Sequence, residues 1–416
     1  MMAYLHVERS NIMTVQKALI SGASIAGLST AFWLSKAGWE VTVIERASTF
    51  RDGGQNVDVR GIAREVLQMM GLEDQVRNQT TTEEGTAFVN EKGQTVGAFP
   101  VEDSDGLTAE LEILRGDLAR IVLDALPAQV QVRYGDWIEH IVDHQEHVEI
   151  DLHSGKTEIY DLLIIAEGVR SRTRDKVFGD RVSRRELGLN IAYGTIERQA
   201  GDDRWWRWYT ATGGRQISLR PDNQGTIRAM LAFKDRDRNL AAIPSEQART
   251  ELSKVFAGAG WEDSRVIDGF ATSQDVYFDY LTQIMMSTWS EGRVCVTGDA
   301  AWCVTPIGGG GSSLALIGGY VLAAFLSQPE SNEAGAIPIC LNKYEQWMRP
   351  IIDKAQHLPP GAPNFFYPQT KIGVGTMQTF IRIASFGPFR KLAARIGHVA
   401  RTQQQLPDIR LVQTTT

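Results

Sequence analysis

Two glycine-rich segments, one near each end of the chain, contain the residue types that bind a phosphorylated cofactor. The first, residues 22–27, reads GASIAG; it follows a strand-like run at 15–21 and precedes apolar residues at helical spacing. In such a turn, one glycine permits the tight strand-to-helix turn, another permits close helix–strand packing, and the helix N-terminus offers N–H groups to phosphate. We expect a dinucleotide pyrophosphate to bind at this turn, at Gly22, Ser24, Ile25, Ala26 and Gly27.

Glu45 ends the next strand-like run, residues 41–44, where an acid binds the adenosine ribose. A carboxylate there accepts hydrogen bonds from the ribose hydroxyls and disfavours a 2′-phosphate, so FAD or NAD fits this pocket better than NADP. Ser24 replaces the second glycine of the usual fingerprint with a small side chain. The alternative interpretation is a plain strand-to-helix turn without a ligand.

The second segment, residues 294–302, reads VCVTGDAAW and precedes four consecutive glycines at 308–311. Asp299 lies just beyond a buried-strand pattern, where a carboxylate can hold ribityl hydroxyls. A helix that starts near Ser312 offers N–H groups to the N1/C2 carbonyl edge of a reduced, anionic flavin. A glycine-rich loop that only eases helix–sheet packing is the alternative. The residues expected to contact the cofactor here are Gly298, Asp299, Pro306, Gly309, Gly311, Ser312 and Ser313.

Length and composition restrict the class of protein. A chain of 416 residues has room for two or three domains, and 43% hydrophobic and 22% charged residues are typical of a soluble globular protein. A net charge of −7 argues against a nucleic-acid or anionic-membrane surface, which requires clustered Lys and Arg. We therefore expect a small-molecule partner, no nucleic acid and no integral membrane anchor.

The cysteines and the N-terminal segment fit a cytoplasmic location. The cysteines lack metal-ligand spacing and an even-numbered disulfide framework, which fits a reducing compartment and predicts no metal site. Residues 1–13 lack the apolar run of a signal peptide, and either Met1 or Met13 is the start. The apolar stretch 314–326 is shorter than the roughly 20 residues that cross a membrane, so it predicts a buried helix. The cysteines are Cys295, Cys303 and Cys340.

Periodic patterns place both glycine segments in one α/β domain that an inserted sheet interrupts. The run 15–44 has the strand–helix–strand pattern of a parallel βαβ unit. Further predicted elements are helices at 61–70 and 115–126, a hairpin at 148–160, buried strands at 162–166 and 293–297, and alternating aromatic-rich strands between about 190 and 234. The predicted domains are a discontinuous Rossmann-like nucleotide-binding domain (14–80, 108–182 and 286–345), an antiparallel-sheet substrate-binding domain (81–107 and 183–285) and a C-terminal helical segment (346–400).

The motif order resembles that of the single-component FAD-dependent aromatic hydroxylases, the class A flavoprotein monooxygenases with the para-hydroxybenzoate hydroxylase fold. Three motifs carry the resemblance, which extends from about residue 17 to at least residue 347. They are the GASIAG turn with Glu45 and Arg46, the segment DLLIIAEGVRSRTR at 161–174, and Gly298-Asp299 with the following glycines. Within the family, the chain is most similar to the tetracycline-inactivating and polyketide-tailoring enzymes.

The resemblance implies further site residues. It assigns Arg46, Asp58 and Arg115 to the FAD site. It also associates the middle motif with binding of both FAD and nicotinamide; in this motif, Glu167 stands where the family has Asp. In the substrate domain, Arg215 stands where such enzymes have a substrate-contacting arginine. Ala192 stands where they have a glutamine, and Trp302 where a histidine is more usual beside the flavin.

The resemblance also implies the reaction. NADPH or NADH reduces FAD, O2 adds at flavin C4a, and the hydroperoxide transfers oxygen to an electron-rich ring or enol, so no protein side chain is expected to be catalytic. The protein must place the substrate and exclude water. Aromatic side chains that would either stack on the substrate or pack the sheet are Trp205, Trp206, Trp208 and Tyr209.

Other interpretations share this fold. They are an FAD-dependent reductase or dehydrogenase and a non-catalytic binding protein like the GDP-dissociation inhibitors, against which Gly298-Asp299 argues. The stretch 380–396, with Arg382, Arg390, Lys391 and Arg395, predicts either a membrane-surface helix or, as we favour, a helix packed across the domain junction. The lack of a thioredoxin-like C-terminal domain fits a monomer or weak dimer.

Overall fold

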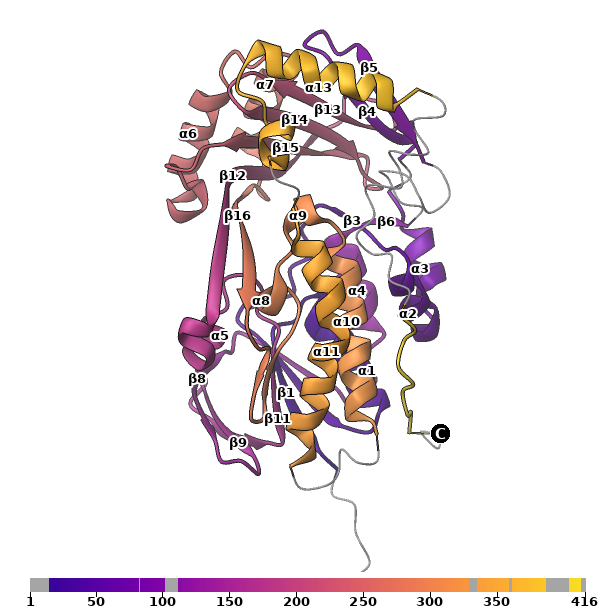
Figure 1. Cartoon of the computed structure of the whole chain (residues 1–416), viewed down its shortest axis with the longest axis vertical. Coiled ribbons are helices and arrows are strands. Elements are labelled where there is room, and N and C mark those ends of the chain that lie inside the picture. Colours follow the sequence, from indigo (N-terminus) through magenta and orange to yellow (C-terminus); the bar gives the residue numbers. More distant parts are fainter. Residues whose placement is uncertain are drawn as a thin grey trace, which may run out of the picture.

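The chain forms two lobes that lie one above the other along the long axis of the molecule (Figure 1). The computed structural model describes residues 15–81, 83–101, 111–328, 335–358, 361–386 and 404–412. The two candidate start residues, Met1 and Met13, lie outside these ranges, and so do Arg390, Lys391 and Arg395. Among the described residues, none of the helices combines the length and hydropathy that crossing a bilayer requires.

The lower lobe contains a sheet in the order β17-β18-β11-β1-β2-β7, with β1 pairing in parallel with both β2 and β11. Its central strands are apolar and buried because helices cover both faces, as the continuous hydrophobic runs predicted. The strands are β1 (Lys17–Ser21), β2 (Glu40–Glu45), β7 (Gln131–Tyr134), β11 (Leu162–Ile165), β17 (Ser290–Glu291) and β18 (Val294–Val296). The predicted hairpin is confirmed within a side sheet of β8 (Ile138–Asp143), β9 (Val148–Leu152) and β10 (Thr157–Tyr160).

Helices α1 (Ile25–Lys36) and α10 (Gly311–Leu326) pack closely in the lower lobe. A Cβ on Gly319 would lie 2.6 Å from Ser29 Oγ, and Ser29 donates a hydrogen bond to the carbonyl of Leu316. Helix α11 (Ala336–Gln356) packs on α10 through buried residues along its length, so the domain boundary expected at residue 346 lies inside one helix. The other helices of this lobe are α2 (Ile62–Met70), α3 (Glu73–Asn78), α4 (Arg115–Asp124), α5 (Arg172–Phe178), α8 (Asp299–Trp302) and α9 (Thr305–Gly308).

The upper lobe is built on a sheet in the order β16-β12-β15-β14-β13-β4-β5, the inserted sheet that the sequence predicted. Its pairs are antiparallel except for β13 with β4, which is parallel. The long strands β12 and β16 extend from this sheet down toward the lower lobe (Figure 1). The strands are β4 (Gly85–Val89), β5 (Thr95–Pro100), β12 (Val182–Glu197), β13 (Trp205–Ala211), β14 (Arg215–Pro221), β15 (Thr226–Lys234) and β16 (Tyr277–Met286).

The two faces of this upper sheet have different neighbours. The outer face packs against α6 (Ser245–Phe256) and α7 (Asp263–Thr272). The inner face points toward α9 and toward the segment after α11, where Ile307, Leu358 and Tyr367 contact it. Helix α13 (Lys371–Ala384) lies on β4 and β5, beyond the short α12 (Ala362–Phe366).

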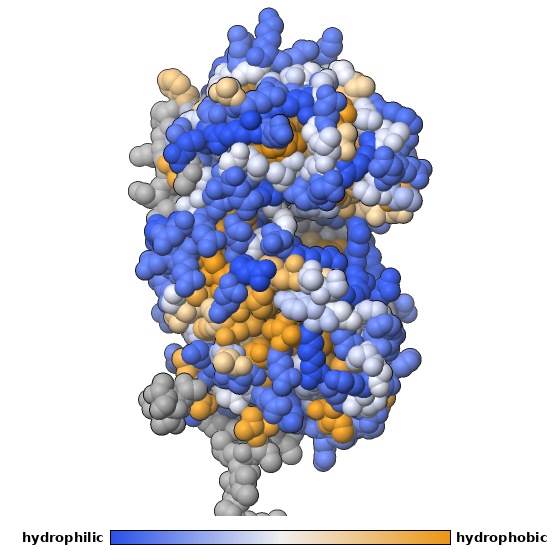
Figure 2. Space-filling view, turned by 180° about the vertical axis from the view of Figure 1, so that it is seen from behind, coloured by the Kyte–Doolittle hydropathy of each residue, from blue (hydrophilic) through white to orange (hydrophobic). Residues whose placement is uncertain are grey.

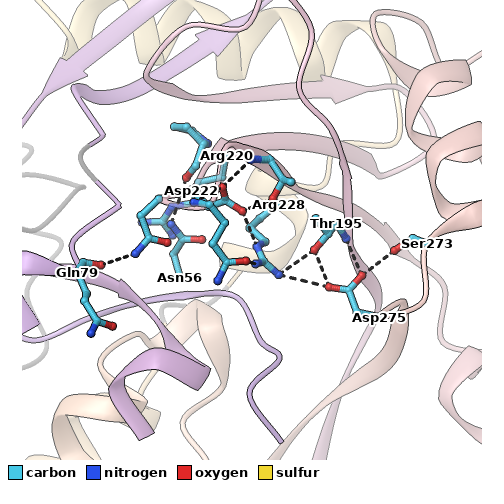
Figure 3. A network of polar contacts seen from close by, with 12 residues as sticks. Asn56, Gln79, Thr195, Arg220, Asp222, Arg228, Ser273 and Asp275 are labelled. Carbon is cyan, nitrogen blue, oxygen red and sulfur yellow. Dashed lines mark hydrogen bonds and ion pairs between the residues drawn. The ribbon is translucent and has the colours of Figure 1, made fainter. Parts of the chain in front are cut away.

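Two buried arginines on the inner face hold the upper sheet in place. Arg220 on β14 donates to Glu83 at 2.7 Å and pairs with Glu112, which lies on β6 (Glu112–Leu114). Strand β6 pairs with β3 (Asn56–Asp58), so this contact connects the upper sheet to a β-ribbon that runs into α4. Arg228 on β15 lies between Asp222 and Asp275 (Figure 3).

We expect Arg220→Ala to lower the free energy of unfolding by about 3–5 kcal/mol, because Glu83 and Glu112 would stay buried without their cation. Arg207→Ala is the matched control, since its ion pair with Asp203 is far more exposed than those of Arg220 and contributes about 1 kcal/mol or less. Urea denaturation of both variants measures the difference. Equal midpoints would contradict a structural role for the Arg220 pairs.

Candidate functional site

The turn at 22–27 leaves no room for side chains at its two glycines. Gly22 has φ +114°, and a Cβ there would lie 2.4 Å from the carbonyl oxygen of Ala166, the residue that follows the neighbouring strand β11. A Cβ on Gly27 would lie 1.9 Å from the carbonyl oxygen of Gly22. Both glycines are therefore required for α1 to begin directly above β1, with its first N–H groups facing outward.

The second glycine segment meets this turn in space. Gly298 follows β18, has φ +63°, and a Cβ there would lie 2.6 Å from Cβ of Ala26. Asp299 is the next residue and begins α8. Two segments separated by more than 270 residues thus form one site at the carboxyl ends of parallel strands, where open α/β sheets bind ligands.

Arg115 connects these segments to α4. Its guanidinium donates to Ser24 Oγ at 2.7 Å, and its charge acts on Asp299. Gly116 allows this approach, because a Cβ there would overlap the carbonyl oxygen of Asp52. The serine in place of the second glycine is therefore a hydrogen-bond partner of the arginine.

Asp299 is exposed at the carboxyl end of β18, on the side of the lower lobe where α8 packs against β16. The side chain is exposed, yet burial by the surrounding protein raises the pKa of its carboxyl group, which the cation of Arg115 opposes and the charge of Asp279 reinforces. Seen from behind, the surface is hollowed between the two lobes, and hydrophobic residues gather below the hollow (Figure 2). A polar ligand with apolar rings fits such a cleft.

The glycines after Asp299 have two kinds of surroundings: one packs against another helix, and others lie in a loop with open space around them. A Cβ on Gly308 would lie 2.6 Å from the carbonyl oxygen of Ala355 in α11, so this glycine serves packing. Gly309 and Gly310 both have φ +71° and open space around them, and Gly311 begins α10. Pro306 is exposed and Ser312 half-buried. Packing therefore explains Gly308, whereas contact of Gly309 and Gly311 with a cofactor stays a prediction.

Thr305 is strained at the start of this loop. It is a β-branched residue at φ +63°, and its buried hydroxyl has no hydrogen-bond partner in the described part of the chain. Such strain is usually retained where the surrounding structure forces it, often at functional sites.

Several predicted cofactor residues already have partners within the protein. The Glu45 carboxylate accepts from the N–H groups of Ala23 and Ala47 at 3.1 and 2.8 Å, and Arg46 is exposed. Ser313 is fully buried; its hydroxyl donates to the carbonyl of Asp58 and accepts from the N–H of Arg60. Asp58 pairs with Arg60 through its carboxylate. The side chain of Ser313 therefore connects α10 to the end of β3, and any effect on the cleft comes through the position of β3.

The middle motif has a structural role in this chain. The Glu167 carboxylate accepts hydrogen bonds from Ser21, Ser171 and Thr173, with hydroxyl contacts of 2.6–2.7 Å. These bonds attach the first turn of α5 to the end of β1. The longer side chain in place of Asp thus spans two elements beside the turn at 22–27.

The inner face of the upper sheet forms the roof of the cleft, and its side chains lie in three rows across the strands. The first, charged row is Asp275, Thr195, Arg228, Arg220 and Trp206. The second, aromatic row is Tyr277, Tyr193, Met230, Ser218 and Trp208. The third row is Asp279, Ile191, Ala232, Gln216 and Thr210.

The three predicted substrate residues lie away from this roof. Ala192 belongs to the outer-face core, and Arg215 donates to the backbone carbonyls of Thr212 and Val255, the latter in α6. Trp302 is buried between Trp289 and Tyr344 in the lower lobe. Their packing explains these residues, so we do not include them in the substrate site.

The same alternation divides the four aromatic residues of β13. Trp206 and Trp208 belong to the inner face, whereas Tyr209 packs in the outer-face core, where its hydroxyl donates to the carbonyl of Ala259. Trp205 borders a separate hollow of about 240 Å³ on the outer side, which contains none of the motif residues. This hollow is therefore not part of the candidate site.

Tyr193, Tyr277 and Asp279 were absent from the sequence prediction. The two tyrosine rings stack at 5.1 Å, and burial raises the pKa of both hydroxyls. The sequence pattern that could have identified this face is the separation of Tyr277 and Asp279 by two residues, because residues two apart on a strand point to the same face. It was obscured because Phe278 and Tyr280, on the opposite face, are also aromatic.

Comparison with known proteins places this geometry among flavoproteins. Residues 15–357 match the family model described as FAD binding domain. The flavin-dependent monooxygenase eupH of Phoma sp is 34% identical over 95% of this chain and 98% of its own length. The tetracycline destructase Tet(51) has TM-score 0.74 and 30% identity over 89% of this chain and 97% of its own. HpxO of Klebsiella pneumoniae, in complex with FAD, shares the fold, with TM-score 0.74 and 22% identity over 92% of this chain and 98% of its own.

We expect Gly27→Ala to weaken FAD binding at least about tenfold, because the new methyl group would displace the backbone of Gly22. The control is Gly375→Ala, in α13, where a Cβ meets no atom within 4 Å. FAD absorbance after gel filtration and a titration of the apoprotein measure binding, with circular dichroism to check folding. A folded Gly27→Ala protein with unchanged FAD affinity would show that the turn does not bind the cofactor.

Proposed function

This chain belongs to the FAD binding domain family and is a flavin-dependent monooxygenase, and we propose that it hydroxylates an aromatic or polyketide small molecule with O2 and electrons from NADH or NADPH. One observation carries the proposal. The two glycine segments meet through Gly298 and Ala26, and helix α8, which begins at Asp299, packs against β16, the strand that carries the stacked Tyr277. A cofactor site and an aromatic-lined roof thus share one cleft.

The residues around the cleft fit FAD. The turn from Gly22 to Gly27, with the N-terminus of α1, would hold the pyrophosphate, and Glu45 would face the adenosine ribose. Asp299 would bind the ribityl chain, with Arg115 beside it as the cation that opposes the rise of its pKa caused by burial. Gly309 to Gly311, at the start of α10, would offer N–H groups to the flavin ring. When bound, the flavin supplies the redox chemistry: it accepts electrons from the nicotinamide and activates O2 for transfer of one oxygen atom.

The protein's own part is to position the substrate and keep the cleft dry. Tyr193, Tyr277 and Trp208 offer ring faces, and Met230 between them adapts to the shape of an apolar ligand. Tyr367 and Ile307 close the other side of the same cluster. In the neighbouring charged row, the guanidinium groups of Arg220 and Arg228 are hydrogen bonded to side chains of the protein.

A flat, fused ring system is the substrate class that this roof supports. The aromatic row crosses several strands, so it can cover more than one ring. Tet(51), which is similar to this chain over most of its length, is by its name a tetracycline destructase. A polyketide-like or other polycyclic aromatic substrate is consistent with both facts.

The test is oxygen-dependent NAD(P)H oxidation by the FAD-loaded protein in a screen of phenols, naphthols and polyketides. A substrate should stimulate oxidation and yield a product with one added oxygen atom that carries the label from 18O2. Separate runs with NADH and NADPH identify the donor. Oxidation without oxygen incorporation would instead support the reductase or dehydrogenase of the same fold.

We expect Asp299→Ala to weaken FAD binding about tenfold or more, because a hydrogen bond to a charged group contributes about 1.5–3 kcal/mol. Asp268→Asn, which removes an exposed carboxylate from α7, should leave FAD affinity unchanged. Titration of each apoprotein with FAD, followed by fluorescence quenching, measures both values. Full flavin retention by the Asp299→Ala protein would remove this residue from the proposed cofactor site.

A further inference from the structure

Both arginines of the charged row in the roof are paired with acidic side chains of the protein itself. Arg220 is held by Glu83 and Glu112, and Arg228 by Asp222 and Asp275, with Thr195 bridging the last pair (Figure 3). Arg220 is also covered by the ring of Trp206, 4.0 Å from its guanidinium carbon. Both guanidinium groups are nearly fully buried by these contacts. Neither arginine of the roof is therefore available to pair with an anionic substrate.

Carboxylates outnumber cations around this row. Arg60 is the third guanidinium group, 3.9 Å from Glu112 and paired with Asp58. The groups of this network are the arginines Arg60, Arg220 and Arg228 and the acids Asp58, Glu83, Glu112, Asp222 and Asp275. An approaching carboxylate would meet more acids than cations in this network, and the charges of its buried members are weakly screened by water.

Asp279 adds a further carboxylate that points to the substrate region. It follows Tyr277 by two residues on β16 and lies opposite Ile191, so it shares the inner face with the stacked tyrosines. Within the described ranges, its only hydrogen bond comes from the backbone N–H of Tyr280, and no side chain bonds to it. Strand β16 packs against α8, which begins at Asp299, and the charge of Asp279 acts on Asp299 and Cys303, so Asp279 lies near the predicted flavin segment.

The cations that act on this side of the cleft lie outside the roof: Arg170 acts on Asp279, and Arg115, the arginine of the predicted cofactor site, acts on Tyr277 and Asp299. Burial raises the pKa of the Asp279 carboxyl group, and Arg170, an exposed residue before α5, opposes this shift. Because Arg170 is exposed, its charge is screened by water, whereas Asp279 is half-buried. Because no side chain among the described residues bonds to the Asp279 carboxyl group, a ligand in the cleft can donate to it.

We propose that this cleft selects neutral, hydroxyl-bearing aromatic rings and excludes aromatic carboxylates, and that Asp279 is the residue that makes this distinction. The ring lies against Tyr193 and Tyr277, and its hydroxyl donates a hydrogen bond to the Asp279 carboxylate. A carboxylate in the same position is repelled by Asp279 and finds no free arginine in the roof. This inference rests on the proposed function and specifies the substrate of the same site.

The test uses ligands of one ring system: 2-naphthol, 2-naphthoate and methyl 2-naphthoate. At pH 7 the naphthol is neutral with a donor, the naphthoate is charged, and the ester is neutral without a donor. Calorimetry and changes in flavin absorbance report their binding to the FAD-loaded protein. We expect 2-naphthol to bind at least tenfold more tightly than 2-naphthoate, with the ester between them.

Asp279→Asn should reduce the naphthol-to-naphthoate affinity ratio to within about threefold, because naphthol loses a charged acceptor while naphthoate loses a repelling charge. Asp268→Asn, the exposed carboxylate on α7, should keep the wild-type ratio. The flavin spectrum and melting temperature of each variant check that the fold is intact. A merely structural role for Asp279 would weaken all three ligands alike.

Three results would overturn this selection rule. They are equal binding of naphthol and naphthoate by the wild-type protein, an unchanged ratio in Asp279→Asn, and no binding of any of the three ligands. The proposed function fails by a different measurement, namely the absence of bound flavin or of oxygen transfer to any substrate. The two failures are therefore distinguishable.

Discussion

The close approach of backbones at three glycines is the constraint on which the site depends. Gly22 lies against the carbonyl of Ala166, Gly27 against the carbonyl of Gly22, and Gly298 against Ala26. These contacts fix where α1 begins relative to β1, β11 and β18. The positions of Arg115, which bonds to Ser24, and of Asp299, which follows Gly298, depend on them in turn.

The roof depends on a different kind of interaction, the ion pairs between Arg220 and the acids below it. Burying charged groups is costly unless they are paired and hydrogen bonded, and here each guanidinium group has carboxylate partners. Such a network adds directional contacts that apolar packing lacks, so it defines one position of the sheet over the cleft. The apolar contacts of Ile307 and Tyr367 complete the enclosure.

The sequence was sufficient for the parts of the protein that depend on local pattern. Continuous apolar runs identified the buried parallel strands, and Gly22 and Gly27 marked the turn because their roles follow from backbone geometry. The substrate side could not be predicted in this way. Neighbouring residues in a strand point to opposite faces, so a shift of one residue separates Ala192 on the outer face from Tyr193 on the inner face.

Long-range partners explain the other differences between prediction and structure. Trp302 is in the core because Trp289 and Tyr344 surround it, and neither is near it in the sequence. Glu167 and Ser313 have polar side chains typical of ligand contacts, but their hydrogen bonds connect elements of the protein. Such partners become visible only once the strands are arranged in space.

The ion pairs of Arg220 also limit how the protein can diversify. The roof comes mainly from residues 182–286, and the motifs below it come from other parts of the chain, so the two can in principle be exchanged independently. Arg220 crosses that division, since Glu83 and Glu112 precede the exchanged segment. A chimera that takes its roof from a relative must therefore keep these acids matched to a cation on β14, or bury uncompensated charge at the joint.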